Sequence, residues 1–441
     1  MKKIIFVLMV SAVSLSAQSF GFGFDDDGGS FGIANNSFAV SIGGDASASM
    51  VGYLEDFSNG MDHTRLGDIF SGNLNFLAKT SAAEGVFNLK LNPSLSPVSI
   101  NEAYLRAFFG NLEITGGLRK LTWGKAESLG PLDVINPLNT SEIYTTMADQ
   151  HSLIGVKIAR PLIHASLRIG QFSKLEGVFV PWFEPHLLSQ KGRWAFSEME
   201  MLTLAQVMGI IVKTPDTTTL DYAQTGFRFT TTLGSSDIGM QYYYGRLPQP
   251  SVGFIYNLPD PMPEVSLIYN PYHQIGFDFA QVLFGFNLRA ELAANITEDL
   301  KGDDGSVYNP SLAWSFGFDR DLFSGINLNF QVNESIRLFN NKTGSEDFMS
   351  GNFDIEGASA MTSTRLTSAF SKKFLRDELE ARAAFAWGIE DKDLLLLPAL
   401  IWTKDDVRIA FSGGFFIGDS DGQLGQYKDN NFLKISLTYS F

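Results

Sequence analysis

Opposite charges lie close together in one stretch of the chain, residues 118–144, which read LRKLTWGKAESLGPLDVINPLNTSEIY. Arg119, Lys120 and Lys125 supply positive charge, and Glu127 supplies negative charge. Such charges, placed across a narrow passage with low-dielectric walls, would focus an electric field and select the solutes that pass. The alternative is a folded loop whose charges pair with one another and seal the passage. Both interpretations require a hollow scaffold around the segment.

The residues just before this segment predict a β-hairpin with one apolar and one polar face. Residues 102–109 and 112–119 alternate on either side of Gly110-Asn111, a tight-turn signal. Arg106 and Arg119 fall on the polar face. A barrel with a wet interior requires this pattern, because its outer face meets lipid and its inner face meets water.

The last eleven residues, NFLKISLTYSF, show the same period-two alternation. Leu433, Ile435, Leu437 and Tyr439 share a face with the terminal residue, Phe441. This ending resembles the C-terminal signature of outer-membrane β-barrels, in which the last strand closes the barrel and is read by the assembly machinery. We therefore expect an all-β, transmembrane antiparallel barrel in the cell outer membrane, with the barrel-assembly machinery as a partner of the Phe441 strand.

Strand-like segments recur along the chain, joined alternately by short turns and long polar loops, the asymmetry typical of such barrels. We count five before Trp123, three between His151 and Val180, and eleven from Ala223 onward, among them Asp237–Asn257 and Ser266–Val282. The total of nineteen is odd, whereas single-chain bacterial barrels normally have an even number. The expectation is therefore about 18 strands (16–20) with short loop helices, the surplus being assigned to residues 122–150.

The two ends and the composition agree with export to the outer membrane. Residues 1–17 read as a signal peptide, with two lysines before an apolar run and small residues before the cleavage site. Residues 18–36 are Gly-rich and predict a flexible periplasmic lead-in, which leaves residues 37–441 for the barrel. The chain has no Cys, 38 Phe and 42 Gly, which suits aromatic girdles and tight turns rather than a disulfide scaffold. A net charge of −15 argues against a nucleic-acid partner.

The connection over residues 183–220 is too long for a simple loop. Its Ser197-Glu198-Met199-Glu200 resembles a capping box and precedes Met201, Leu204 and Met208 at helical spacing. A short amphipathic helix is expected here. It either packs on its own loop at the rim or acts as a lid or plug in the mouth of the barrel.

Several short motifs, in order along most of the mature chain, resemble a domain-of-unknown-function family of porin-like outer-membrane barrels from Gram-negative bacteria. The first is an "LR" strand followed by Trp-Gly-x-x-(Glu/Ser) and then Asn-Pro. The others are a Pro-x-Phe-x-Pro block, a Gly-x-Arg strand with a Tyr-rich strand after it, and an Arg-x-Glu strand. They are carried here by Leu118-Arg119, Trp123-Gly124, Glu127, Asn136-Pro137, Leu175–Pro185, Gly226-Phe227-Arg228, Tyr242–Arg246 and Arg289-Ala290-Glu291. Lys125 departs from the pattern, and the resemblance implies a barrel but no substrate.

Other chemistry has little support in the sequence. His164-Ala165-Ser166 is similar to the His-x-Ser of outer-membrane phospholipases, but the Asn-Gly that should follow is Leu167-Arg168. The histidines lack zinc-site spacing, and Asp419-Ser420-Asp421-Gly422 lacks the further ligands of a calcium loop. We therefore expect no enzyme activity, catalytic residue, metal or cofactor.

The favoured function is a passive, porin-like channel for small solutes, narrowed by an inserted loop. One alternative is a transporter of hydrophobic or lipid-like ligands that uses the helix near Met201. Another is an adhesin or structural barrel that uses acidic loops such as Asn340–Ile355. Expected partners are outer-membrane lipid and a small solute or hydrophobic ligand. The candidate constriction residues are Arg106, Arg119, Lys120, Trp123, Lys125, Glu127, Asn136, Arg228 and Glu291.

Overall fold

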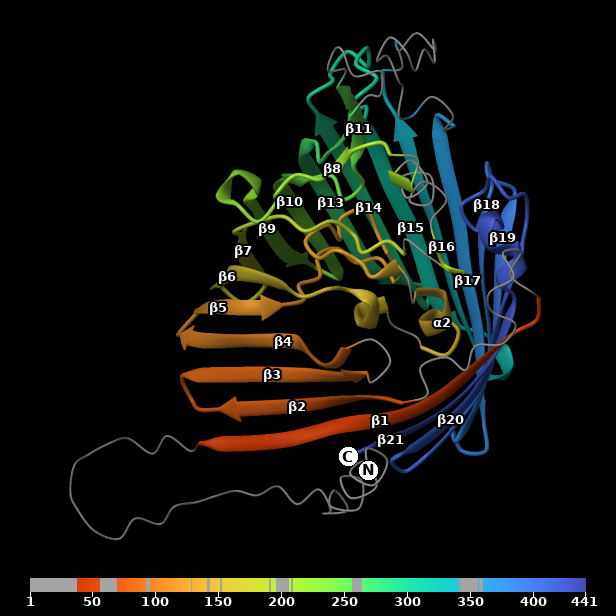
Figure 1. The fold of residues 1–441 in the computed structure, drawn as a ribbon. Helices are drawn as coiled ribbons and strands as arrows, with labels where there is room; N and C mark the ends of the chain where they lie inside the picture. Colours follow the sequence, from red (N-terminus) through yellow and green to blue (C-terminus); the bar gives the residue numbers. More distant parts are fainter. Residues whose placement is uncertain are drawn as a thin grey trace, which may run out of the picture.

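The computed structural model describes the greater part of the chain as one barrel (Figure 1). The expected signal peptide, the lead-in, and the helix residues Met201, Leu204 and Met208 lie outside the described residues, as does most of Asn340–Ile355. The described ranges are 38–55, 70–92, 96–127, 129–140, 143–150, 153–189, 192–195, 206–207, 209–255, 264–339, 341, 356 and 360–441.

Eighteen antiparallel strands form a single closed sheet, in which each strand pairs with its neighbour in the sequence order. The predicted fold class and strand number are thereby confirmed. The strands are β1 (Ala39–Tyr53), β2 (Ser71–Lys79), β3 (Ala83–Asn92), β4 (Ser96–Phe109), β5 (Leu112–Arg119), β6 (Arg160–Ile169), β7 (Ser173–Val180), β9 (Gln224–Leu233), β10 (Ser236–Arg246), β13 (Pro271–Leu283), β14 (Phe286–Thr297), β15 (Ser311–Asp321), β16 (Ile326–Arg337), β17 (Thr362–Phe374), β18 (Leu379–Gly388), β19 (Asp393–Lys404), β20 (Val407–Ile417) and β21 (Phe432–Ser440).

The last strand closes the ring by pairing with the first. β21 lies antiparallel to β1, with Ala46 opposite Tyr439 and Tyr53 opposite Phe432. Phe441 extends the ladder, because its backbone N–H donates to the Gly44 carbonyl at 3.0 Å and its carbonyl accepts from the Gly44 N–H at 2.9 Å. Closure removes the unpaired strand edges that could not be satisfied in lipid.

Side chains alternate between an apolar outside and a polar inside. In β13, Ile275 and Phe277 are exposed, whereas their neighbours Gln274 and Asp278 are buried inside the barrel. The same alternation on β21 exposes Leu433, Ile435, Leu437 and Tyr439, as the sequence predicts. Large apolar side chains on the outer surface are stable only against hydrocarbon, so the protein is a barrel of the outer membrane.

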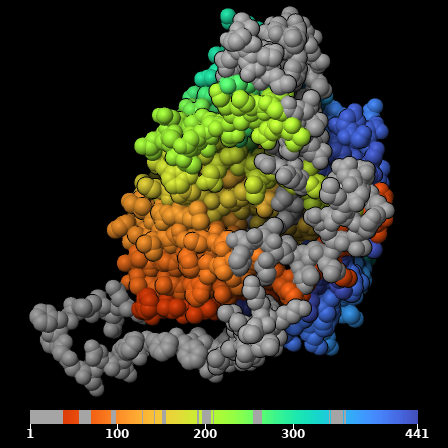
Figure 2. Space-filling view, in the orientation of Figure 1, coloured from red at the N-terminus to blue at the C-terminus, as the bar shows by residue number. Residues whose placement is uncertain are grey.

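All the long connections lie at one end of the barrel, and the other end has only turns of two to four residues. Two-residue turns join β4 to β5, β13 to β14, and β19 to β20, whereas residues 120–159, 181–223 and 247–270 are long connections at the other end. The chain enters β1 and leaves β21 at the short-turn end. In outer-membrane barrels, short turns face the periplasm, and this assigns the long connections to the outer mouth. Figure 2 shows the N-terminal strands, coloured red to orange, next to one another on the lower part of the surface in this view.

The surplus strand of the sequence count lies between His151 and Val180, not in residues 122–150. Two strands, β6 and β7, occupy this stretch instead of three. Leu153–Val156 forms a 3-10 helix, η2, before β6 begins at Arg160. A four-residue apolar run does not distinguish a strand from a helical turn, which explains the error.

Two further predicted strands, Asp237–Asn257 and Ser266–Val282, are too long. β10 ends at Arg246 and β13 starts at Pro271. Between them, β11 (Ser251–Ile255) and β12 (Glu264–Ile268) pair with the two-residue strand β8 (Val212–Lys213) in a separate three-stranded sheet. Alternation continues through both sheets, so the sequence pattern does not reveal where the barrel wall stops.

Helices among the described residues are short. α2 (Ile143–Met147) and η2 lie between β5 and β6, and η5 (Gly425–Asn430) precedes β21. In the described part of the chain, no helix is long and apolar enough to cross a membrane.

Candidate functional site: a segment fastened inside the barrel

Residues 120–159, which connect β5 to β6 and are called the inner segment below, fold into the barrel (Figure 1). They contact the inner wall at widely separated places. The wall partners, in the order of the inner segment, lie on β9, β14, β16, β13, β10, β18, β20 and β21. The inner segment therefore reaches as far as β16, turns back to β13 and β10, and then crosses to β18, β20 and β21 before it leads into β6.

Glu291 on β14 is the main anchor. Its Oε1 accepts hydrogen bonds from the backbone N–H groups of Lys125 and Ala126, the second at 2.7 Å, and its Oε2 accepts from Leu132 at 3.3 Å. The carboxylate is 3% exposed, so the inner segment supplies the hydrogen bonds that water would otherwise provide. A carboxylate that accepts several backbone N–H bonds fixes the path of the loop around it.

Three glutamine side chains on the wall reinforce this anchor. The Nε2 of Gln241 on β10 donates to the Leu132 carbonyl at 3.0 Å, and that of Gln274 on β13 donates to the Pro131 carbonyl at 3.0 Å. Gln331 on β16 accepts from the Glu127 N–H at 3.1 Å. All three amides are buried. Their side chains replace the backbone pairing that an irregular segment lacks.

Small residues on the wall let the inner segment approach closely. The Trp123 indole lies over Gly226 of β9, where an added Cβ would come within 2.8 Å of the ring. Leu132 lies over Gly276 of β13, where an added Cβ would come within 2.4 Å of the leucine side chain. Both apolar side chains are buried. Because these two glycines have no side chain, the side chains of the inner segment can pack directly against the wall there.

On the opposite wall, Asp149 fastens the inner segment near its helical part. Its Oδ2 lies 3.0 Å from the Nζ of Lys434 and accepts from the Ser436 hydroxyl at 2.9 Å, both on β21. Its backbone carbonyl accepts a hydrogen bond from Arg408 on β20. Asp149 is absent from the candidates of the sequence analysis. The available signal was Lys434, a cation on the inward face of the last strand.

Two ion pairs hold the inner segment together and to its neighbours. The buried Lys157 forms an ion pair of 2.5 Å with Asp133, whose side chain is 10% exposed, and Lys157 also donates to the Thr122 hydroxyl at 2.7 Å. Burial raises the pKa of Asp133, while the Lys157 ammonium opposes that shift. Glu127 pairs with Arg289 of β14 at 2.8 Å. Some charges of the inner segment therefore pair locally, as the alternative interpretation of the sequence expects.

Four of the nine predicted constriction residues are buried where side chains hold the inner segment or the wall together. Trp123 and Glu291 are described above. Asn136 bridges the ends of the inner segment by accepting from the Leu121 N–H at 2.7 Å and donating to the Ile158 carbonyl at 2.9 Å. Arg228 donates to Asp278 at 2.6 Å and to Gln241 at 2.6 Å. Burial assigns these four to holding the inner segment and the wall together rather than to a water-exposed surface.

The other five predicted residues keep partial exposure on β4, at the end of β5 and along the inner segment. Arg119 lies over the Tyr104 ring, 5.2 Å from its centroid, and donates to Thr115 at 3.2 Å. Lys125 reaches Asp237 at 3.7 Å, and Glu127 reaches Arg289. Arg106 lies 3.8 Å from Glu84, and Lys120 follows Arg119 directly. These side chains are available to water in the lumen.

Polar side chains also line the wall over β1 to β5. Asn73 donates to both oxygens of Asp45, at 2.9 and 3.2 Å, and the backbone N–H of Lys120 donates to Glu102 at 2.8 Å. Asn75 is exposed on the same inward face. This wall lies opposite the strand on which Glu291 anchors the inner segment, and it carries charges of both signs.

The connection after β7 also folds inward, which the sequence analysis did not foresee at these residues. Trp194 packs among Tyr53, Tyr144, Phe416 and Tyr427, with ring centroids 5.4 to 6.2 Å away. Its Nε1 donates to the Tyr53 hydroxyl at 3.0 Å. The aromatic cluster joins this connection to α2 and to the wall near β20.

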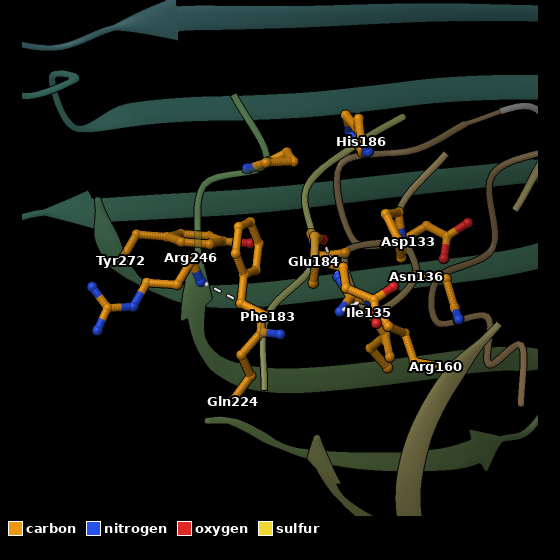
Figure 3. Close-up of a pocket in the computed structure, with 13 residues that line it drawn as sticks. Asp133, Ile135, Asn136, Arg160, Phe183, Glu184, His186, Gln224, Arg246 and Tyr272 are labelled. Atoms are coloured by element: carbon orange, nitrogen blue, oxygen red, sulfur yellow. Dashed lines mark hydrogen bonds and ion pairs between the residues drawn. The ribbon is translucent and has the colours of Figure 1, made fainter. Parts of the chain in front are cut away.

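A cavity of about 200 Å³ opens where the inner segment meets the connection after β7 (Figure 3). It lies at the long-connection end of the barrel, since Arg160, Gln224 and Tyr272 stand at the starts of their strands and Arg246 at the end of β10. Its lining mixes apolar and polar side chains: Asp133, Val134, Ile135, Asn136, Pro137, Arg160, Phe183, Glu184, His186, Gln224, Arg246, Pro248 and Tyr272.

Solved outer-membrane proteins share this architecture. OccK9 (OpdG) of Pseudomonas aeruginosa has a TM-score of 0.50 and 10% identity, over 92% of this chain and 97% of that chain. Wzi of Escherichia coli, described as a carbohydrate-binding β-barrel involved in capsule assembly, has a TM-score of 0.46 and 10% identity, over 91% and 84%. The channel DcaP of Acinetobacter baumannii has a TM-score of 0.40 and 11% identity, over 92% and 97%. No protein-family model and no curated protein matches the chain.

The fold and the likeness to OccK9 define the class: an outer-membrane β-barrel of porin-like architecture. Within that class, this chain is an eighteen-stranded barrel with an anchored inner segment. The resemblance to the domain-of-unknown-function family has support at the level of this fold, and no family model extends it to the short motifs.

Proposed function

We propose that the protein is a passive channel for small solutes, and that the inner segment narrows its lumen. The observation that carries the proposal is the attachment of the inner segment to the wall by Glu291, while charged side chains next to it keep contact with water. A segment fixed in this way reduces the cross-section of the lumen without filling it by a separate domain. Its partly exposed charges give the remaining passage an electrostatic preference.

The wall over β1 to β5 supports a passage on that side. Most of its inward side chains are polar or charged, with Leu77 and Val86 as apolar exceptions, and Arg106 and Arg119 flank Tyr104 there. Arg106 is paired only loosely, at 3.8 Å from Glu84. A solute that passes between this wall and the inner segment would meet cations and carboxylates in turn.

Single-channel recording of the refolded protein in planar bilayers tests the proposal. We expect discrete conductance steps at high salt. Their absence, in preparations that migrate as folded barrels, would show that the lumen is sealed and that the charges of the inner segment serve only to close it.

The two other functions considered from the sequence gain no specific observation. The helix expected to bind hydrophobic ligands and most of the loop expected to mediate adhesion fall outside the described residues. Both therefore stay predictions of the sequence.

A further inference from the structure

The cavity at the outer mouth contains a buried cation with unused hydrogen-bond donors. Arg160, the first residue of β6, is 1% exposed and lines the cavity. Its Nη2 donates to the Glu184 carbonyl, but its Nε and Nη1 have no hydrogen-bond partner. Nη1 forms one long ion pair, 4.0 Å from Oε2 of Glu184. A buried guanidinium with two unsatisfied nitrogens is costly unless a ligand or water completes its shell.

Apart from the long ion pair with Glu184, the charges around Arg160 are committed to other partners. Asp133, the acid on the facing side of the cavity, forms an ion pair with Lys157. The other oxygen of Glu184 accepts from the Trp182 indole at 3.1 Å. Arg246, the second cation of the lining, donates to the carbonyls of Tyr269 and Asp221. It extends away from the other labelled side chains (Figure 3).

The remaining lining favours a ligand with an apolar body. Phe183, Ile135 and Tyr272 are buried and surround the cavity together with two prolines. The Phe183 ring lies 5.7 Å from the Arg160 guanidinium carbon, so a charged group and an apolar group would be held side by side. The volume of about 200 Å³ lies below the range of sites for drug-sized ligands, which limits the occupant to a small molecule.

We propose that this cavity binds a small organic carboxylate, with its carboxylate group on the Arg160 nitrogens that lack a hydrogen-bond partner, in place of the long contact with Glu184, and its apolar body against Phe183 and Ile135. Arginine is suited to this role because its planar guanidinium donates to carboxylates in charge-assisted hydrogen bonds. The site stands at the outer mouth, where a solute would first meet the inner segment. Binding does not depend on conduction, so the inference goes beyond the proposed channel.

Isothermal titration calorimetry of the full mature barrel in detergent tests the inference, with benzoate as the probe and empty micelles as the blank. We expect saturable binding of one benzoate per chain. Benzamide, which has the same shape without charge, and sulfate, which lacks an apolar body, should both bind at least tenfold more weakly. Equal heats from benzoate and benzamide, or from benzoate and sulfate, would overturn the assignment, as would no saturable benzoate binding.

Two variants locate the site. Arg160→Gln should weaken benzoate binding about ten- to a hundredfold, the loss typical of a charge-assisted hydrogen bond. Val134→Phe keeps the charge but fills the cavity, and it should weaken binding even where Arg160→Gln does not fold. Arg168→Gln changes an exposed arginine on the same strand and serves as the matched control. Benzoate binding that survives Val134→Phe in a folded barrel would place the ligand elsewhere. A barrel that conducts ions without binding benzoate would refute this inference and leave the proposed channel intact.

Discussion

Glu291 on β14 and Ala126 in the inner segment are joined by a hydrogen bond of 2.7 Å, although 165 residues separate them along the chain. The carboxylate also accepts from Lys125 and Leu132, and an added Cβ on either Gly124 or Gly130 would come within 2.3 Å of its oxygens. The inner segment is therefore wrapped around one buried side chain. Gly124 has a φ of 95°, a conformation that favours glycine, so the wrap depends on that residue as well.

Replacing this anchor should loosen the inner segment while the barrel persists. Glu291→Gln substitutes an N–H donor for one acceptor, and each buried backbone N–H left without a partner costs about 1–3 kcal/mol. We expect noisier single-channel current and faster proteolysis within the inner segment. Glu298→Gln, an exposed site just beyond the same strand, is the control. Unchanged current in Glu291→Gln would show that the inner segment does not depend on this anchor.

The contact between Trp123 and Gly226 gives a steric prediction. Gly226→Val would push into the indole ring, which is rigid, and overpacking of this kind costs about 1–3 kcal/mol. The variant should unfold at a lower denaturant concentration and show altered tryptophan fluorescence. Gly116→Val, on β5, has open space around its Cβ position and should leave both readouts unchanged. Equal behaviour of the two variants would contradict the close packing described above.

The strands of the barrel could be predicted from the sequence because the alternation of apolar and polar residues is visible within each strand, without knowledge of its neighbours. Alternation around residues 311–321 and 407–417 gives β15 and β20 with the bounds that the structure has. The inner segment has no such period. Its position follows from partners on distant strands, such as Asp149 with Lys434, which no local pattern connects. Arg228 and Glu291 could be recognised as inward-facing, but their burial depends on how the inner segment covers them.

Substituting one partner of the buried Arg228–Asp278 ion pair should lower the free energy of unfolding more than substituting both. Asp278→Asn leaves Arg228 as a buried charge without a counter-ion, and such changes cost about 3–5 kcal/mol. Adding Arg228→Gln removes that charge, so the double variant should lose less stability than the two single variants together. Equilibrium unfolding in guanidinium measures this coupling. Strict additivity would mean that the two side chains do not stabilise each other.

His186 should make the outer mouth sensitive to acid. Its Nδ1 accepts a hydrogen bond of 3.0 Å from the Leu138 N–H in the inner segment, which requires the unprotonated ring nitrogen. Burial, aided by the positive charge of Arg160, lowers the pKa of His186 to about 4. The unfolded chain binds a proton near pH 6.5 and the folded chain does not, so this contribution is present above pH 6.5 and is lost as the pH falls toward 4.

The difference in pKa corresponds to roughly 3 kcal/mol. Proteolysis of the inner segment should therefore become faster in the native protein as the pH falls from 6.5 to 4. His186→Asn, which cannot titrate, should flatten that pH dependence, whereas His273→Asn on the exposed outer face should not. The same pH dependence in His186→Asn and in the native protein would assign the effect to other groups.

Arg119 should contribute to the ion preference of the lumen. It is partly exposed at the end of β5, next to Lys120 and over the Tyr104 ring, so its charge acts on the water beside the inner segment. Arg119→Gln should shift the reversal potential in a salt gradient toward cations, because a narrow passage with one fewer fixed cation attracts fewer anions. Arg168→Gln, whose arginine pairs with Glu113 near the short-turn end, should change the potential less. If the two variants shift it equally, the preference comes from the summed charge of the barrel and not from a constriction beside the inner segment.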